Sequence, residues 1–330
     1  MKQQHTTLSR RSFIGSAAAF TTAAVLARQV AVIADERPNS NFGGVQIGVI
    51  TYSYRALPCS AEELLKYITQ CGINSVELMG DAAEEFAKRH TPETGVGGPM
   101  DGYAALRKLY NEAGVNIHIV KFGDIGDDNV PDERIDYYFQ AAKALGAKGI
   151  TRELPENVAL AKRLGPLADK NEIVVGFHNH TQITPTTYDG DLLSYGKFLG
   201  INLDIGHYVA GTGEPVIPMI EKHHDRIISL HLKDRKKKSL LSGAPNMPFG
   251  EGDTQVAEVL QFLKKNKMTF PCDIELDTIS PKVPMRSKKW LDAWRSAKRR
   301  WCRQVIPWAA IHETLLLPQN NENRSALFRL

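Results

Sequence analysis

Cysteine is scarce in this sequence. Only four cysteines occur among the 330 residues, and none of them belongs to a CxxC pair. Cys59, Cys71, Cys272 and Cys302 therefore lack the paired spacing of a zinc ribbon. We expect mostly buried or inert thiols, with disulfides only if the protein is exported.

Long hydrophobic runs are also lacking. The apolar run at residues 15–27 is rich in alanine and poor in leucine. It is too short for a stable membrane span of about 20 residues. It follows the segment SRRSFI at residues 9–14, and this arrangement resembles a twin-arginine signal with cleavage after Ala27 or Ala34. We therefore expect residues 1–34 to be a signal peptide outside the fold, and the protein to be periplasmic or otherwise extracytoplasmic. A membrane anchor and a basic tail are the alternatives.

The middle of the chain has no excess of positive charge. The formal net charge is +4, but residues 1–34 carry +4 and residues 279–330 carry +8, which leaves residues 35–278 at −8. A mildly acidic body with an ordinary apolar fraction of 42% is typical of a soluble enzyme-like globule. We expect no nucleic-acid partner and no stable membrane insertion.

A phosphate-binding GxGxxG after the first strand, usual in doubly wound sheets, is missing. Short apolar runs instead alternate with helical segments. The predicted strands are 45–51, 75–78, 115–120, 149–151, 173–177, the runs ending at Asp204 and His231, and 270–274. The predicted helices include 60–71, 103–113, 132–145, 156–170, 215–224 and 255–265, with a long loop at 90–102. This alternation predicts a closed (β/α)8 barrel at residues 45–278, after a linker at 35–44.

Side chains of the kinds that bind metal ions follow four of these strands. Glu153, Asp204, His231 and Glu275 each stand at or just past the end of an apolar run. In a (β/α)8 barrel the carboxyl ends of the strands form the active site. Three carboxylates and one imidazole suit Mn2+, Mg2+ or Co2+ better than a structural zinc site. Each residue alone is also explained as a helix cap or a surface charge, so the interpretation depends on their joint placement.

Four motifs carry a resemblance to a known family. They are HNH at 178–180, LDIGH at 203–207, LHLKD at 230–234 and IELD at 274–277. In this order they resemble the xylose isomerase-like TIM barrel superfamily, in its sugar phosphate isomerase/epimerase branch. The resemblance covers residues 45–277 and implies a TIM barrel fold.

The resemblance also implies one divalent metal ion, with Mn2+ expected first and Mg2+, Co2+ or Zn2+ as alternatives. Its ligands would be Glu153, Asp204, His231 and Glu275, with Glu156 as a rival of Glu153. We expect Glu153 and Glu275 to double as acid/base groups, with His180 as the alternative base. The residues expected to bind the substrate are His178, His207, Lys233, Glu77 and Lys121. Lys233 has an alternative role as a partner of Asp234.

Such a site would act on a ketose, keto-sugar or related polyol. A metal ion bound by neighbouring hydroxyl and carbonyl oxygens acidifies the adjacent C–H and stabilises the enediolate formed on deprotonation. Return of the proton gives epimerisation or isomerisation. Expulsion of a leaving group would make the enzyme a lyase or dehydratase acting on a keto-glycoside or inosose. A non-catalytic sugar-binding barrel is a further alternative, whereas an endonuclease is disfavoured by the acidic body.

The basic tail at 279–330 departs from the family pattern. It contains all four tryptophans of the chain, three of which recur at near-helical spacing. This spacing fits a last barrel helix, whereas the abrupt change of composition also fits a shifted reading frame. We expect residues 318–330 to be disordered. Homo-oligomers are frequent in the family that the chain resembles.

Overall fold

The computed structural model describes residues 37–276, apart from residues 92–97, 99 and 240–242. The predicted signal peptide and the basic tail, with its tryptophans and Cys302, lie outside the described residues. The described cysteines Cys59, Cys71 and Cys272 are free thiols. No helix in the described part of the chain is both long and apolar enough to cross a membrane.

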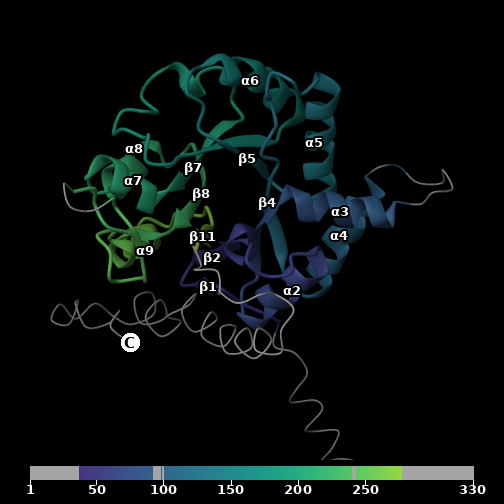
Figure 1. Cartoon of the computed structure of the whole chain (residues 1–330), viewed down its shortest axis with the longest axis horizontal. Coiled ribbons are helices and arrows are strands. Elements are labelled where there is room, and N and C mark those ends of the chain that lie inside the picture. The colour runs from purple at the N-terminus through teal and green to yellow at the C-terminus, as the bar shows by residue number, and fades with distance from the viewer. Residues whose placement is uncertain (1–36, 92–97, 99, 240–242, 277–330) are drawn as a thin grey trace, which may run out of the picture. The chain divides into compact units, whose positions relative to one another are not determined.

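Eight parallel strands close into a barrel, which confirms the predicted fold (Figure 1). They are β2 (Val45–Ile50), β3 (Ser75–Met79), β4 (Asn116–Lys121), β5 (Gly149–Glu153), β6 (Val174–His178), β7 (Leu199–Asp204), β8 (Ile227–Leu232) and β11 (Cys272–Ile274). Each strand pairs with the next along the chain, and β11 pairs with β2 to close the ring. A short strand, β1 (Asn41–Phe42), pairs antiparallel with β2 inside the predicted linker.

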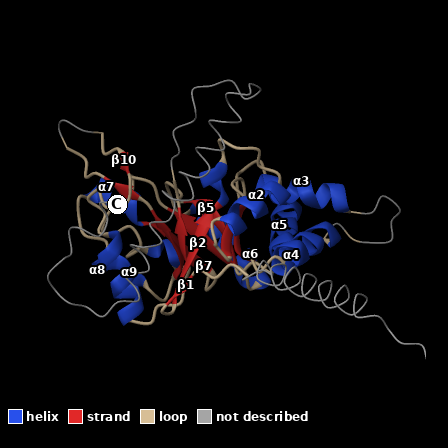
Figure 2. Ribbon diagram, turned by 90° about the horizontal axis from the view of Figure 1, so that it is seen from below, coloured by secondary structure: helices blue, strands red, loops and turns tan. Residues whose placement is uncertain are grey.

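Helices surround the strands, as Figures 1 and 2 show. They are α2 (Ala61–Gln70), α3 (Gly80–His90), α4 (Asp101–Glu112), α5 (Asp132–Leu145), α6 (Ala159–Asn171), α7 (Ile205–Thr212), α8 (Ile217–His223) and α9 (Val256–Lys265). The short elements are η1 (Thr51–Tyr54), η2 (Asp191–Leu193), β9 (Asp234–Arg235) and β10 (Asn246–Met247). The sequence interpretation missed α3 and α7. Helix α3 buries Ala82, Ala83, Phe86 and Ala87, which have helical spacing.

Helix α2 begins with a capping box formed by Ser60 and Glu63. The Ser60 hydroxyl accepts a hydrogen bond from the Glu63 N–H at 3.2 Å, and the Glu63 carboxylate accepts one from the Ser60 N–H at 3.3 Å. Two backbone donors that would lack partners at the first turn are thereby satisfied.

We expect Ser60→Ala to lower the free energy of unfolding by about 1 kcal/mol, because an unsatisfied helix start costs about that much. Urea unfolding followed by circular dichroism measures it. Thr69→Ala is the control in the same helix, since the Thr69 hydroxyl only adds bonds to the Leu65 and Lys66 carbonyls of the helix itself. Its effect should stay within about 0.5 kcal/mol, and an equal loss in both variants would contradict the capping role.

Polar side chains fill the inside of the barrel. Strand residues alternate between the two faces of the sheet, so an inward set and an outward set follow from the sequence. The inward set bonds across the ring: Glu77 on β3 reaches His231 on β8, and His118 on β4 reaches Asp273 on β11. Gly48 makes room for this layer, because a Cβ there would lie 2.1 Å from Asp273 Oδ1. The outward set, such as Ile47 and Val76, forms the apolar core against the helices.

Candidate active site

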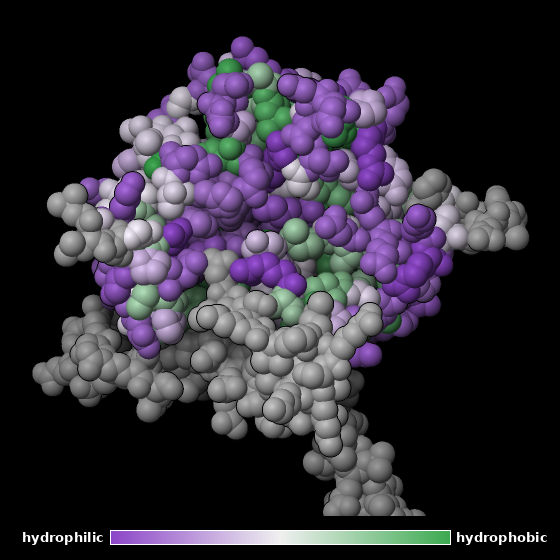
Figure 3. Space-filling view, viewed as in Figure 1, coloured by the Kyte–Doolittle hydropathy of each residue, from purple (hydrophilic) through white to green (hydrophobic). Residues whose placement is uncertain are grey.

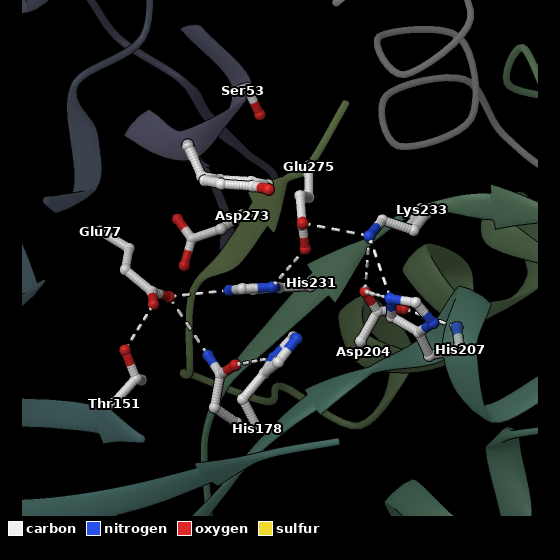
Figure 4. Close-up of polar contacts among 12 residues, drawn as sticks. Ser53, Glu77, Thr151, His178, Asp204, His207, His231, Lys233, Asp273 and Glu275 are labelled. Carbon is white, nitrogen blue, oxygen red and sulfur yellow. Dashed lines mark hydrogen bonds and ion pairs between the residues drawn. The ribbon is translucent and has the colours of Figure 1, made fainter. Parts of the chain in front are cut away.

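Four buried side chains converge at the carboxyl ends of neighbouring strands. His178 ends β6, Asp204 ends β7, His231 lies near the end of β8, and Glu275 follows β11. One nitrogen or oxygen atom from each lies within 4.8 Å of those of the other three. Figure 4 shows the four side chains pointing toward one another. The structure thus brings together three predicted ligands, Asp204, His231 and Glu275, and adds His178, which was predicted to bind substrate.

His231 lies between two carboxylates. Its Nδ1 is 2.8 Å from Glu275 Oε2, and its Nε2 is 2.8 Å from Glu77 Oε2. Burial alone would lower the pKa of His231, but Glu77 and Glu275 raise it to about 10. The same contacts, together with Lys233, hold the pKa of Glu275 well below its usual range despite its burial. Because Glu77 accepts the Nε2 proton, Nδ1 is the nitrogen that can release its proton and bind a metal ion.

The side-chain amide of Asn202 orients His178, and the amide's own oxygen and nitrogen positions are fixed by Glu77. Asn202 Nδ2 donates to Glu77 Oε2 at 3.2 Å, and a carboxylate can only accept. Asn202 Oδ1 must therefore accept the Nδ1 proton of His178, at 2.6 Å. Burial, with the charges of His231 and Lys121, holds the pKa of His178 well below its usual range. The ring is neutral, so its Nε2 offers a lone pair to the site.

Asp204 is held by the helix that follows it. Its Oδ1 caps α7 by accepting the His207 N–H at 2.7 Å. Its Oδ2 is buried and accepts no hydrogen bond, although Lys233 Nζ lies 3.4 Å away. Lys233 Nζ also lies 3.1 Å from Glu275 Oε1 and is almost fully buried. Burial raises the pKa of Asp204, and Lys233 offsets this only in part.

The donor set fits a divalent metal ion. Asp204 Oδ2 is a buried oxygen without a hydrogen bond, and two imidazoles have second nitrogens fixed by Glu77 and Asn202. A carboxylate or carbonyl oxygen on the outer nitrogen is the usual support of a metal-binding histidine. Two imidazoles with two carboxylates suit Zn2+, Co2+ or Mn2+ better than Mg2+, which prefers oxygen ligands.

Glu153 lies with Lys121 and His180, and is in none of the groups of described residues close enough to share an ion. Its Oε1 is 2.7 Å from Lys121 Nζ, and its Oε2 is 3.5 Å from His180 Nε2. The rings of His180 and His207 are 4.8 Å apart, which places this group beside the buried one. Glu156, the rival of Glu153, is exposed. A ligand role for Glu153 stays a prediction.

The remaining predicted residues take different positions. Glu77 is fully buried and bonds Thr151, Asn202 and His231, so it supports the site from within the barrel. Asp234, suggested as the partner of Lys233, instead accepts backbone bonds from Gly250, Gly252 and Thr254. Sequence reasoning missed Asn202, His118 and Asp273. Their only signal was a polar residue inside an apolar run.

Hydrophilic residues gather at the centre of the face shown in Figure 3, over the ring of strands. The polar surface of this region agrees with the charged and polar side chains inside the barrel. Together they define a (β/α)8 protein with a polar, charged interior at the carboxyl ends of its strands.

The model of the xylose isomerase-like TIM barrel family matches residues 65–303, and the chain belongs to this family. No curated protein sequence matches it.

Solved structures share the fold at low identity. A probable 3-DHS dehydratase, AsbF from Bacillus anthracis, is 13% identical, with 79% of this chain and 97% of that one covered and a TM-score of 0.59. The IOLI protein with a binding zinc atom is 12% identical, with 83% and 100% covered and a TM-score of 0.59. A xylose isomerase domain protein from Planctomyces limnophilus is 16% identical, with 84% and 99% covered and a TM-score of 0.54.

Proposed function

We propose that the protein is a divalent-metal-dependent sugar isomerase or epimerase that moves a proton beside the carbonyl of a keto-sugar. The observation that carries the proposal is the buried group of His178, Asp204, His231 and Glu275 at the ends of four strands. These residues would hold the ion, which supplies charge that acidifies a C–H next to a carbonyl.

The residues around the ion site supply the groups for proton transfer. Glu153 and His180 form a carboxylate–imidazole pair beside the buried group. A carboxylate or imidazole within reach of a carbon acid can remove its proton and return it to the other face or to the next carbon. Lys233 and His207 contact each other beside His178 and would orient the substrate oxygens. Export through the twin-arginine pathway is a further proposal, based on residues 1–34.

Solvent-deuterium exchange tests the function. We expect the purified protein, supplied with Mn2+ or Zn2+, to introduce deuterium from D2O beside the carbonyl of a ketose, with D-fructose, D-tagatose and D-psicose as first probes. After removal of the metal ion, mass spectrometry and NMR would read the label. Glu153→Gln should slow exchange by about 100-fold or more, because it removes a proton-transfer group.

Glu156→Gln is the matched control for this variant. It changes an exposed carboxylate three residues away and should exchange at the wild-type rate. Equal rates in the two variants would contradict the role of Glu153. A wild-type protein that binds metal but converts a keto-sugar to an unsaturated product would replace the isomerase by the lyase. A metal-loaded protein that binds these ketoses without exchange or elimination would indicate a sugar-binding barrel.

A further inference from the structure

The imidazole of His207, on α7, has a cation beside each of its two nitrogens. Its Nδ1 lies 2.5 Å from Arg235 Nη1, and its Nε2 lies 3.2 Å from Lys233 Nζ. The Nε2 side faces the site, because Asp204 Oδ2 is 3.7 Å away. A neutral imidazole has one lone pair and one N–H, so only one of the two cations can donate a hydrogen bond to it.

Arg235 is the better hydrogen-bond donor to that lone pair. A guanidinium only donates and does not lose its charge in proteins. Lys233 is farther from the ring, and its ammonium also has Glu275 at 3.1 Å and Asp204 at 3.4 Å as acceptors. The lone pair therefore belongs on Nδ1 and the proton on Nε2. A cation beside each of the two ring nitrogens also disfavours a second proton, so the ring is neutral.

Arg235 is itself held in place. Its Nε and Nη2 donate to the Ala244 carbonyl at 3.1 and 2.6 Å, and its backbone N–H donates to the Thr254 hydroxyl at 3.2 Å. Nη1 is left to face His207. The guanidinium is thus aimed by the segment between β9 and β10, and not by His207 alone.

The proton position on His207 decides between two roles. His178, His180 and His207 are close enough to share a metal ion, with ligand atoms within 4.8 Å. A histidine that binds an ion through Nε2 needs its lone pair there and its proton on Nδ1. His178 has that arrangement through Asn202, whereas His207 has the reverse.

We propose that Arg235 is a positioning residue that fixes His207 in the Nε2–H tautomer, so that His207 donates a hydrogen bond to a substrate oxygen and does not bind the metal ion. The identity of the acceptor rests on the proposed function, but the tautomer does not. Sequence reasoning assigned His207 to substrate binding, and Arg235 supplies the physical reason for it.

Histidine side-chain NMR tests the tautomer directly. Long-range 1H–15N correlation spectra of the full chain, labelled at histidine and measured with Zn2+ and after dialysis against a chelator, distinguish protonated from unprotonated ring nitrogens. His207→Gln assigns the signal. We expect Nε2–H for His207 in both states. In Arg235→Met the lone pair should pass to Lys233 and the proton to Nδ1, whereas Arg235→Lys should retain Nε2–H because it still offers a donor to Nδ1.

Arg163→Met is the matched control. Arg163 also donates to backbone carbonyls, those of Gly126, Asp127 and Val130, and its loss should leave the His207 tautomer unchanged. Wild-type His207 protonated on Nδ1, or Nε2–H persisting in a folded Arg235→Met variant, would overturn the proposal. Absence of sugar turnover would leave the NMR result unaltered, so failure of the proposed function is distinguishable from failure of this inference.

Discussion

Asp204→Asn should weaken binding of Mn2+ or Zn2+ by at least about 100-fold, because changing residues that merely support a ligand already costs 10- to 100-fold. Asparagine keeps an oxygen to cap α7 but loses the charge of the buried Oδ2. His231→Ala should have a similar effect. Elemental analysis after dialysis against a metal buffer measures the loss, and wild type should hold about one equivalent.

Thermal unfolding gives a second readout of the same site. A ligand at 100 times its Kd stabilises the folded state by about 2.7 kcal/mol. We expect the added ion to stabilise wild type by about this amount and Asp204→Asn hardly at all. The control is Asp189→Asn, since Asp189 pairs with Lys222 and His223 and is in none of the groups of described residues close enough to share an ion. Wild type without metal after incubation with Mn2+ or Zn2+ would remove the basis of the catalytic proposal.

Two further variants decide which residue completes the ligand set. The structure groups His178 with Asp204, His231 and Glu275, whereas the family resemblance assigns Glu153 to that place. If the structural group is the ligand set, His178→Ala should lose the ion and Glu153→Gln should keep it. The reverse pattern would restore the set inferred from the sequence. If Glu153→Gln keeps the ion, slower exchange in that variant reports the loss of a proton-transfer group.

The fold was predictable because its signals are local. Each apolar run followed by a helical segment is one βα unit, and Asp204, His231 and Glu275 could be chosen as candidate ligands because they stand at or just past the ends of such runs. Helix α7 was missed because its two glycines are typical of a loop, and its start depends on the cap that Asp204 supplies. Arg235 was missed because it begins a run of basic residues that resembles a solvated surface.

The network inside the barrel depends on pairings that sequence patterns do not contain. Alternation within a strand tells which residues share a face, but not which residues meet across the ring. Glu77 and His231 are 154 positions apart, and they meet because β3 and β8 both face the barrel interior. The sequence pattern places Glu77 near the end of a strand, and Glu77 was therefore predicted to bind the substrate. In the closed barrel Glu77 instead contacts His231 Nε2, where its negative charge raises the pKa of the imidazole.

Glu77→Gln should lower the free energy of unfolding of the metal-free protein by about 3–5 kcal/mol near pH 6, since removing one partner of a buried pair leaves the other charge poorly compensated. The glutamine side chain keeps nearly the same shape, so the loss reports charge more than packing. Urea unfolding after dialysis against a chelator measures it. Glu62→Gln is the control, because Glu62 pairs with Arg89 at the surface. Its effect should not exceed about 1 kcal/mol.

The pH dependence of stability should change in the same variant. The pKa of His231 is raised to about 10, so the stability from its protonation is complete below the ordinary imidazole value of about 6.5 and is lost as the pH rises toward 10. The pKa of Glu77 is lowered despite its burial, because His231 favours its charged form, so its contribution is present above about 4.5 and is lost in acid. Wild type should therefore be most stable between these values. In Glu77→Gln the total loss of stability above pH 6.5 should be smaller and should end at a lower pH, because the imidazolium has lost one of its two carboxylates and its pKa falls. An unchanged loss over the same pH range would mean that Glu275 alone sets the charge of His231.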